Sequence, residues 1–179
     1  MGFSSVAFDP GDIATNSDAA SSALAEANSA SSAAAALKQN ITDMDVSPNS
    51  NHTANGPQTD DINAGESVAA GECVYLHSDG EWHLTDADAA ASADGMLAIS
   101  LEAKVNGSAM NVALPGSFVR NDSWAWTAVG VTLYLDTSAA GGFTETAPSG
   151  EDDVVRIAGY ATHTDRMYFS PLVPIVYAE

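Results

Sequence analysis

The feature that most constrains this chain is a run of residues, 12–44, that is rich in alanine and serine and contains neither glycine nor proline. Alanine has the highest helix propensity, whereas glycine and proline interrupt helices. The run therefore predicts an α-helix. Asp12, at its start, suits an N-cap or first-turn position, where a carboxylate favours the positive end of the helix dipole.

Two sets of mostly small or apolar residues recur every seven positions along this run. One set is Ile13, Ala20, Ala27, Ala34 and Ile41, and its companion set is Asn16, Ala23, Ala30, Leu37 and Met44. Such a repeat is typical of a coiled-coil seam, here made mostly of alanine. Because one helix of this kind is marginal alone, we expect a stalk that packs against copies of itself. The alternative is a polar linker that is only partly ordered.

Residues 65–179 consist of short apolar segments separated by turn residues, which is the pattern of a β domain. Residues 74–77 and 82–84 flank Asp79-Gly80, a pair typical of a two-residue type I′ turn, and predict a hairpin. Further strands are predicted over residues 96–101, 110–114, 118–120, 131–135, 154–160, 166–169 and 173–177. The expected fold is mainly β: an antiparallel β-sandwich or small barrel head preceded by the α-helical, coiled-coil-like stalk.

Two further segments complete the expected organisation. Residues 1–11 have spaced apolar residues and suit an extended docking lead. Residues 45–64 contain Pro48, Gly56 and Pro57 and predict a linker of roughly 20 residues, long enough for part of it to pack on the head or a neighbour. The expected order is docking lead (1–11), helical stalk (12–44), linker (45–64) and β-rich head (65–179).

The charge of the chain is strongly negative: five basic side chains stand against 24 acidic ones, for a net charge of -19. Such a chain repels nucleic-acid phosphates, and no apolar stretch reaches the roughly 18 residues that predict a membrane span. A disordered acidic protein is one alternative, but 45% hydrophobic residues argue for a packed core. Since Lys38 and Lys104 are the only lysines, we expect a folded protein adapted to high salt, which screens carboxylate repulsion.

Sequence motifs for catalysis are absent: there is no Gly-x-Ser-x-Gly elbow, phosphate loop or dinucleotide fingerprint. We therefore expect no enzyme activity, no catalytic residue and no cofactor. His77 and His83 flank the predicted turn, but a two-residue loop pairs His77 with Trp82 and Leu76 with His83. That register places the two imidazoles on opposite faces of the sheet and predicts no metal site. Cys73, the only cysteine, is expected to be a buried small hydrophobe.

Surface and packing candidates are of two kinds. Four Asn-x-Ser/Thr sequons are candidate glycosylation sites: Asn40, Asn51, Asn106 and Asn121. Trp124 and Trp126 are separated by one residue, so both side chains would face the same side of a strand. A packing role, in the core or at a subunit interface, is favoured over a sugar-stacking platform because tryptophan anchors interfaces as readily as it binds ligands.

Several short motifs lie along residues 64–179: Ala64-Gly65-Glu66, Gly71 to Leu76, Asp79 to Trp82, Phe118 to Thr127, Leu133 to Leu135, Thr146 to Gly150 and Asp165 to Phe169. Together they resemble the β-rich C-terminal module of capsid-decoration and fibre proteins of tailed viruses. The Ala/Ser helix is similar in composition to tail-fibre stalks, and the acidity points to a virus of a halophilic, archaeal host. The resemblance implies a homotrimer on the particle and supplies no catalytic residue.

The expected function is that of a virion structural protein. As a capsid decoration on the outside of a tailed-virus head, it would stabilise the shell or present a surface to the host. Its expected partners are copies of itself and the major capsid protein or other virion proteins. The alternative is a tail-fibre or receptor-binding component that contacts host surface glycan or S-layer, and a cell-surface enzyme ranks lowest. About 30 helical residues span only ~45 Å, which is short for a host-reaching fibre and favours the capsid.

Overall fold

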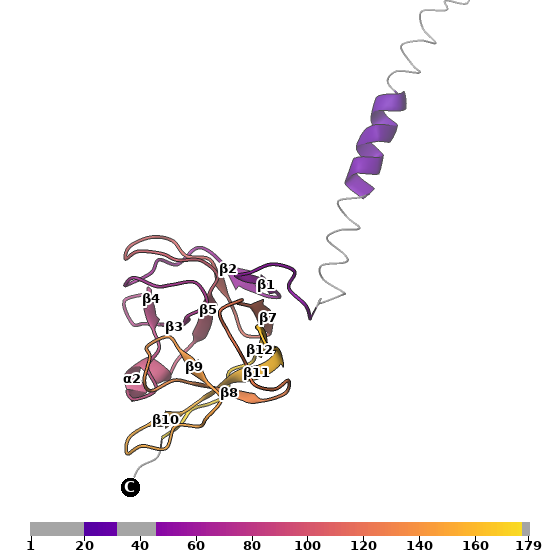
Figure 1. Cartoon of the computed structure of the whole chain (residues 1–179). Helices are drawn as coiled ribbons and strands as arrows, with labels where there is room; N and C mark the ends of the chain where they lie inside the picture. Colours follow the sequence, from indigo (N-terminus) through magenta and orange to yellow (C-terminus); the bar gives the residue numbers. More distant parts are fainter. Residues whose placement is uncertain (1–19, 32–45, 177–179) are drawn as a thin grey trace, which may run out of the picture. The chain divides into compact units, whose positions relative to one another are not determined.

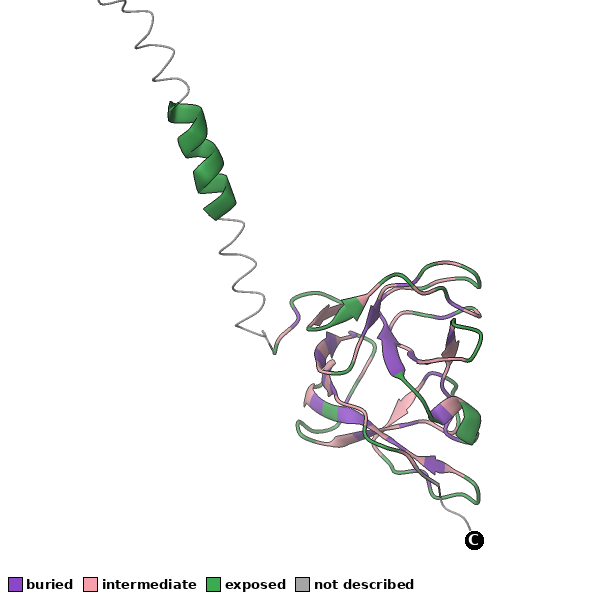
Figure 2. Cartoon of the chain, turned by 180° about the vertical axis from the view of Figure 1, so that it is seen from behind, coloured by how far each residue is buried: buried purple, intermediate pink, exposed green. Residues whose placement is uncertain are grey.

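The computed structural model describes residues 20–31 and 46–176 of the chain. The chain divides into two compact units, Met1–Met44 and Asp45–Glu179. In the first unit, residues 20–31 form an α-helix whose residues are all exposed (Figure 2). Within the described residues, no helix combines the length and the apolar character needed to cross a membrane.

The second unit, which we call the head, is mainly β, as predicted (Figure 1). A six-stranded antiparallel sheet has the order β1 (Thr53–Asn55), β7 (Ser117–Arg120), β12 (Arg166–Phe169), β11 (Ile157–His163), β8 (Thr132–Leu135) and β9 (Phe143–Thr144). A five-stranded antiparallel sheet has the order β2 (Gln58–Thr59), β6 (Val112–Ala113), β5 (Leu97–Ser100), β3 (Cys73–Leu76) and β4 (Trp82–Leu84). A two-stranded sheet pairs β10 (Val154–Val155) with β13 (Ile175–Val176), and α2 (Ala90–Ala93) is a single short turn of helix.

Apolar side chains of the head form two clusters, and β5 contributes to both. Leu97 and Ile99 belong to the larger cluster, which also receives Leu133 and Phe169 from the six-stranded sheet. Ala98 belongs to the smaller cluster. Because neighbouring residues of a strand face opposite sides of the sheet, β5 is covered on both faces, and all four of its residues are buried.

The largest side chain of the smaller cluster is that of Trp82. This side chain is fully buried together with Val74, Met110 and Val112. The cluster also contains Ala64 and Val68, so the chain between β2 and β3 covers one face of the five-stranded sheet.

Residues 45–64, which the sequence predicts to be a linker, contain two strands of the head. β1 pairs with β7, and β2 pairs with β6. The linker prediction is therefore wrong from β1 onward. These strands are very short and polar, with the sequences TAN and QT, so they have no apolar alternation that would predict them. The expected docking lead, residues 1–11, lies outside the described residues.

A buried arginine divides one of the predicted strands. The predicted strand over 154–160 is divided at Arg156, between β10 and β11, where the side chain turns inward and the residue is only 6% exposed.

Cys73 is buried, as predicted, and burial raises the pKa of its thiol to about 12. The thiol therefore stays protonated at neutral pH, and a protonated thiol is a poor nucleophile and metal ligand.

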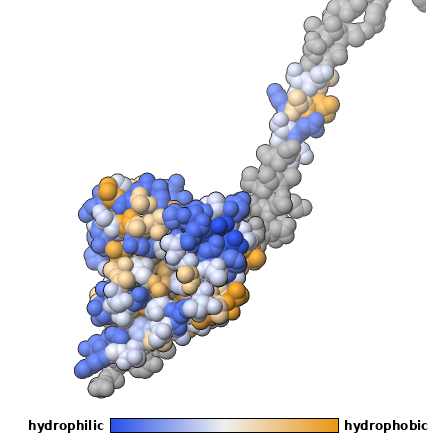
Figure 3. Space-filling view, in the orientation of Figure 1, coloured by the Kyte–Doolittle hydropathy of each residue, from blue (hydrophilic) through white to orange (hydrophobic). Residues whose placement is uncertain are grey.

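The acidic side chains of the described residues lie at least partly in solvent. The buried polar side chains are Thr85, Ser100, Ser117, Asn121 and Arg156, and no carboxylate is among them. On the face seen in Figure 3, hydrophilic residues predominate over scattered apolar ones. The repulsion within this surface is therefore open to screening by dissolved salt.

We expect the melting temperature of the protein to rise by about 5 °C or more between 0.1 M and 1 M KCl, because the Debye length falls from about 10 Å to about 3 Å over this range. Differential scanning calorimetry measures the change. Screening predicts that most of the rise occurs below about 1 M, whereas general salting-out effects keep increasing at higher concentrations. A melting temperature indifferent to salt would reject the adaptation to high salt.

Candidate functional site

The hairpin of β3 and β4 brings together His77, Asp79 and His83, whereas the sequence predicted that the two histidines lie on opposite faces. Tyr75 pairs with His83 and Leu76 with Trp82. This register differs by one residue from the predicted one. Since a shift of one residue moves every side chain of a strand to the opposite face, the two imidazoles lie on the same side of the hairpin. The argument from register against a metal site is therefore wrong.

The turn itself explains the difference in register. A type I′ turn needs positive φ at both Asp79 and Gly80, but only Gly80 has one, +87°. The amide of Gly80 donates to the carbonyl of His77, and the amide of His77 donates to the carbonyl of Glu81. The loop thus has three residues, 78–80, and ends in a glycine with left-handed backbone, which is a common alternative for a hairpin.

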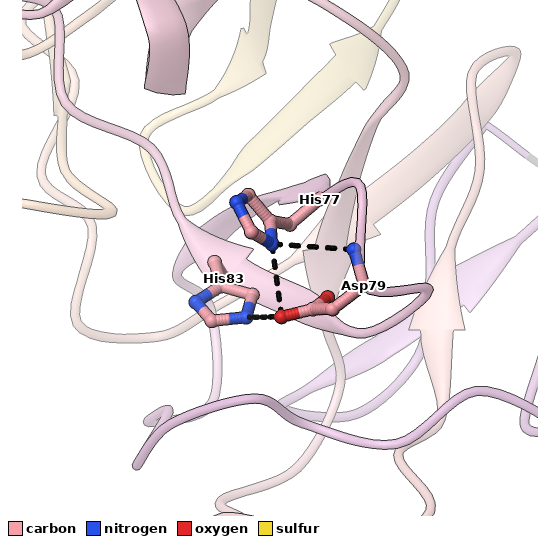
Figure 4. A group of neighbouring side chains, drawn as sticks. All are labelled: His77, Asp79 and His83. Carbon is pink, nitrogen blue, oxygen red and sulfur yellow. Dashed lines mark hydrogen bonds and ion pairs between the residues drawn. The ribbon is translucent and has the colours of Figure 1, made fainter.

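The three polar side chains of the cluster meet at one oxygen (Figure 4). Asp79 Oδ2 lies 2.9 Å from His77 Nδ1 and 3.0 Å from His83 Nε2. The two imidazole ring centroids are 4.7 Å apart. The amide of Glu81 donates to Asp79 Oδ1 over 2.9 Å. This amide and the two imidazoles lower the pKa of Asp79 to about 2, so the carboxylate is ionised at neutral pH.

His83 is positioned by a segment that runs beside β4. The amide of Gly65 donates to the carbonyl of Trp82, and a methyl group at residue 65 would lie 2.1 Å from His83 Nε2. Gly65 therefore leaves the space that the imidazole occupies. Glu66 Oε1 accepts a hydrogen bond from the amide of Leu84, at 2.9 Å, and lies 3.5 Å from His83 Nδ1.

The cluster is accessible from solvent. The side chains of His77 and Asp79 are 40% and 43% exposed. An open groove of about 590 Å³ lies between the end of β3 and α2, and its lining includes Tyr75, His77, Ala90 and Asp94. Small solutes can therefore reach the imidazole of His77.

Trp124 and Trp126 lie in a loop between β7 and β8, where the sequence analysis expected a strand. Their ring centroids are 5.3 Å apart, and Trp124 also contacts Phe143 edge-on at 5.8 Å. Trp126 is 9% exposed and belongs to the larger apolar cluster, against which Trp124 packs. Of the two expected packing roles, the structure supports the core of the head, and Trp126 is not available as an interface anchor.

The sequon asparagine Asn121 is buried in the folded head. Its side chain is 3% exposed, and its Oδ1 accepts hydrogen bonds from the amide and hydroxyl of Ser123. A methyl group at Gly71 would lie 1.8 Å from Asn121 Nδ2, the atom that would carry a glycan. The folded head therefore has no room for a glycan at this position, and the candidate site is wrong for the folded protein.

The other sequons have different surroundings. Asn51 and Asn106 are exposed, so both are open to a modifying enzyme. Asn106 Nδ2 also donates to the carbonyl of Gly65 over 2.8 Å and so supports the segment beside His83. Asn40 lies outside the described residues.

The expected stalk seam falls partly within the described helix. Ala20, Ala23, Ala27 and Ala30 lie on it, and all four are exposed. Ile13, Ala34, Leu37 and Ile41 lie outside the described residues. The pairing of helices in a coiled coil therefore stays a prediction.

Comparison of the chain with protein-family models, with curated proteins and with solved structures found no match.

Proposed function

We propose that the protein is a non-enzymatic structural component of a tailed-virus particle, in which copies of the chain join through their Ala-rich helices and display the β head on the capsid surface. The observation that carries this proposal is the exposed helix of residues 20–31. A short helix is marginally stable by itself, so packing of its exposed face against another chain would stabilise it.

The partner we propose for this helix is a second copy of itself. Ala20 and Ala27 occupy one seam position of the heptad, and Ala23 and Ala30 occupy the other. Leu24 is 63% exposed and directly follows Ala23, so it widens the same apolar stripe. The small seam residues allow close approach of the helices, and the proposed trimer rests on the resemblance to virus proteins.

For the head, we propose a β-sandwich as the finer description of the fold. The larger apolar cluster supports it, because this cluster takes side chains from both the five-stranded and the six-stranded sheet. A head with a packed core between two sheets suits a domain that is displayed on a particle without changing its conformation.

The location on a particle is supported by the resemblance of residues 64–179 to the head modules of tailed-virus structural proteins. The exposed carboxylates support a particle of a halophilic host, because they keep a protein hydrated where salt is concentrated. The proposed partners are the major capsid protein or other virion proteins, and the host surface is the environment that the head would face.

Labelling purified particles of the encoding virus with a gold-conjugated antibody against the head tests this function. We expect label over the whole capsid shell, at many copies per particle. Label confined to the tail tip would favour the tail-fibre alternative, with host surface glycan or S-layer as partner. Absence of label, together with absence of the protein from the particle's mass spectrum, would contradict both virion roles.

A further inference from the structure

We propose that the tip of the β3–β4 hairpin binds a divalent transition-metal ion of the zinc class through His77 Nδ1, an oxygen of Asp79 and His83 Nε2. Each residue offers one ligand atom, and these atoms all lie within 4.8 Å of one another. All three come from one hairpin, so the site is formed wherever the hairpin is formed. The proposal is independent of where the protein is located.

The ligand set fits zinc rather than a hard cation. Two imidazole nitrogens and one carboxylate oxygen are ligands that zinc and its neighbours among the divalent transition metals accept. Calcium and magnesium prefer oxygen ligands throughout. Three protein ligands leave one tetrahedral position, which water can fill because His77 and Asp79 are open to solvent.

Binding of the ion requires the three ligand atoms to rearrange. With bonds of about 2.0–2.1 Å, a tetrahedral zinc ion separates its ligand atoms by about 3.3 Å. Asp79 Oδ2 lies 2.9 Å and 3.0 Å from the two imidazole nitrogens, so these two separations must widen by a few tenths of an ångström. The two nitrogens lie within 4.8 Å of each other, and rotation of the exposed His77 side chain can bring them to the required separation. Each imidazole binds the ion through the lone pair of its ligand nitrogen and carries its proton on the other ring nitrogen.

Glu66 gives an independent indication of a metal site. In metal sites, the ring nitrogen that does not bind the ion usually donates to a carboxylate or carbonyl, which orients the ligand. Glu66 Oε1 lies 3.5 Å from His83 Nδ1, the nitrogen facing away from Asp79, and is itself held by the amide of Leu84. The Glu66 carboxylate therefore lies where a group that orients the His83 imidazole is needed.

Gly65 contributes to the same arrangement. The position requires no positive φ, so the backbone does not call for glycine there. A side chain at this position would instead clash with His83 Nε2, the proposed ligand atom. The segment of Gly65 and Glu66 thus contacts both ring nitrogens of one imidazole, although Glu66 lies 18 residues from Leu84 on β4.

Isothermal titration calorimetry with Zn²⁺ tests the proposal, using the full chain without a histidine tag and without chelating buffer. We expect one ion per chain, and in a parallel titration Co²⁺ should develop the visible absorption of a tetrahedral site. His77→Ala and His83→Ala should each abolish binding at this site. Glu66→Gln should keep binding but weaken it about 10-fold or more, because it changes only the orienting group.

His163→Ala is the matched control. This imidazole also faces a carboxylate in a turn, with Nδ1 2.5 Å from Asp165 Oδ1, yet within the described residues no third ligand completes a metal-binding group there. Its loss should leave Zn²⁺ binding unchanged. Binding that survives in His77→Ala and His83→Ala, or no Zn²⁺ binding by the wild type, would overturn the proposal. If His83→Ala disturbs the circular dichroism of the head, the Glu66→Gln affinity decides, and an unchanged affinity counts against the site.

Discussion

Replacing Arg156 with methionine is expected to lower the free energy of unfolding of the head by about 2–4 kcal/mol. The guanidinium of Arg156 donates to three carbonyl oxygens: Nη1 to Ala93, Nη2 to Gly95 and Nε to Leu172. Methionine fills similar space but has no donor, so these acceptors lose their partners. Hydrogen bonds to a charged group contribute about 1.5–3 kcal/mol each, and partial rehydration of the carbonyls keeps the loss below the sum.

Urea unfolding at constant salt measures this loss, with an unchanged m-value showing that the unfolded reference is the same. Arg120→Met is the matched control, because Arg120 pairs with the partly exposed carboxylates of Asp122 and Asp165 and its removal should cost about 1 kcal/mol or less. Arg156→Lys should fall between the wild type and Arg156→Met, since one ammonium group cannot serve three separated carbonyls. Equal losses in Arg156→Met and Arg120→Met would refute the structural role of Arg156.

Placing aspartate at Ala27 is expected to reduce the proposed oligomer to single chains of 18.3 kDa. Ala27 occupies a seam position of the heptad, so each copy would bring an unpaired carboxylate into the contact between helices. Burying an unpaired charge costs several kcal/mol per ion, which exceeds what an alanine seam contributes. Light scattering coupled to size-exclusion chromatography in molar KCl measures the mass.

Ala25→Asp is the matched control for this experiment. It makes the same substitution two residues away, on the side of the helix opposite the seam, and changes net charge and helix propensity equally. The Ala25→Asp protein should keep the mass of the wild type. A wild-type protein that is a single chain would contradict the assembly, and equal masses of the two variants would contradict the heptad register.

Most of the β structure could be predicted because it depends on local patterns. In β7 and β8, buried and more exposed residues alternate, which is the signal that a strand leaves in the sequence when one face is covered. The missed strands β1, β2 and β9 have two or three residues each. They are strands because they pair with an existing edge of a sheet, and that pairing leaves no pattern in two or three residues.

The cluster of His77, Asp79 and His83 was missed, although the two histidines were considered as metal ligands. Histidine-Ser-Asp-Gly-Glu is compatible with a two-residue or a three-residue hairpin loop, and the two differ by one residue in register. That single residue decides whether His77 and His83 share a face. A glycine preceded by serine and aspartate also fits the three-residue loop, and this was the signal that could have revealed the cluster.

The sequence by itself determined the helix over residues 20–31, the mainly β head and the burial of Cys73, because each depends on residue type or on spacing within a few neighbours. Only the tertiary structure decided the face of the two histidines, the place of Glu66 beside His83 and the three carbonyls around Arg156. Glu66 is 18 residues from the Leu84 amide that holds it, and Arg156 is 63 residues from Ala93. Contacts over such separations arise from how the sheets pack, and no local pattern encodes them.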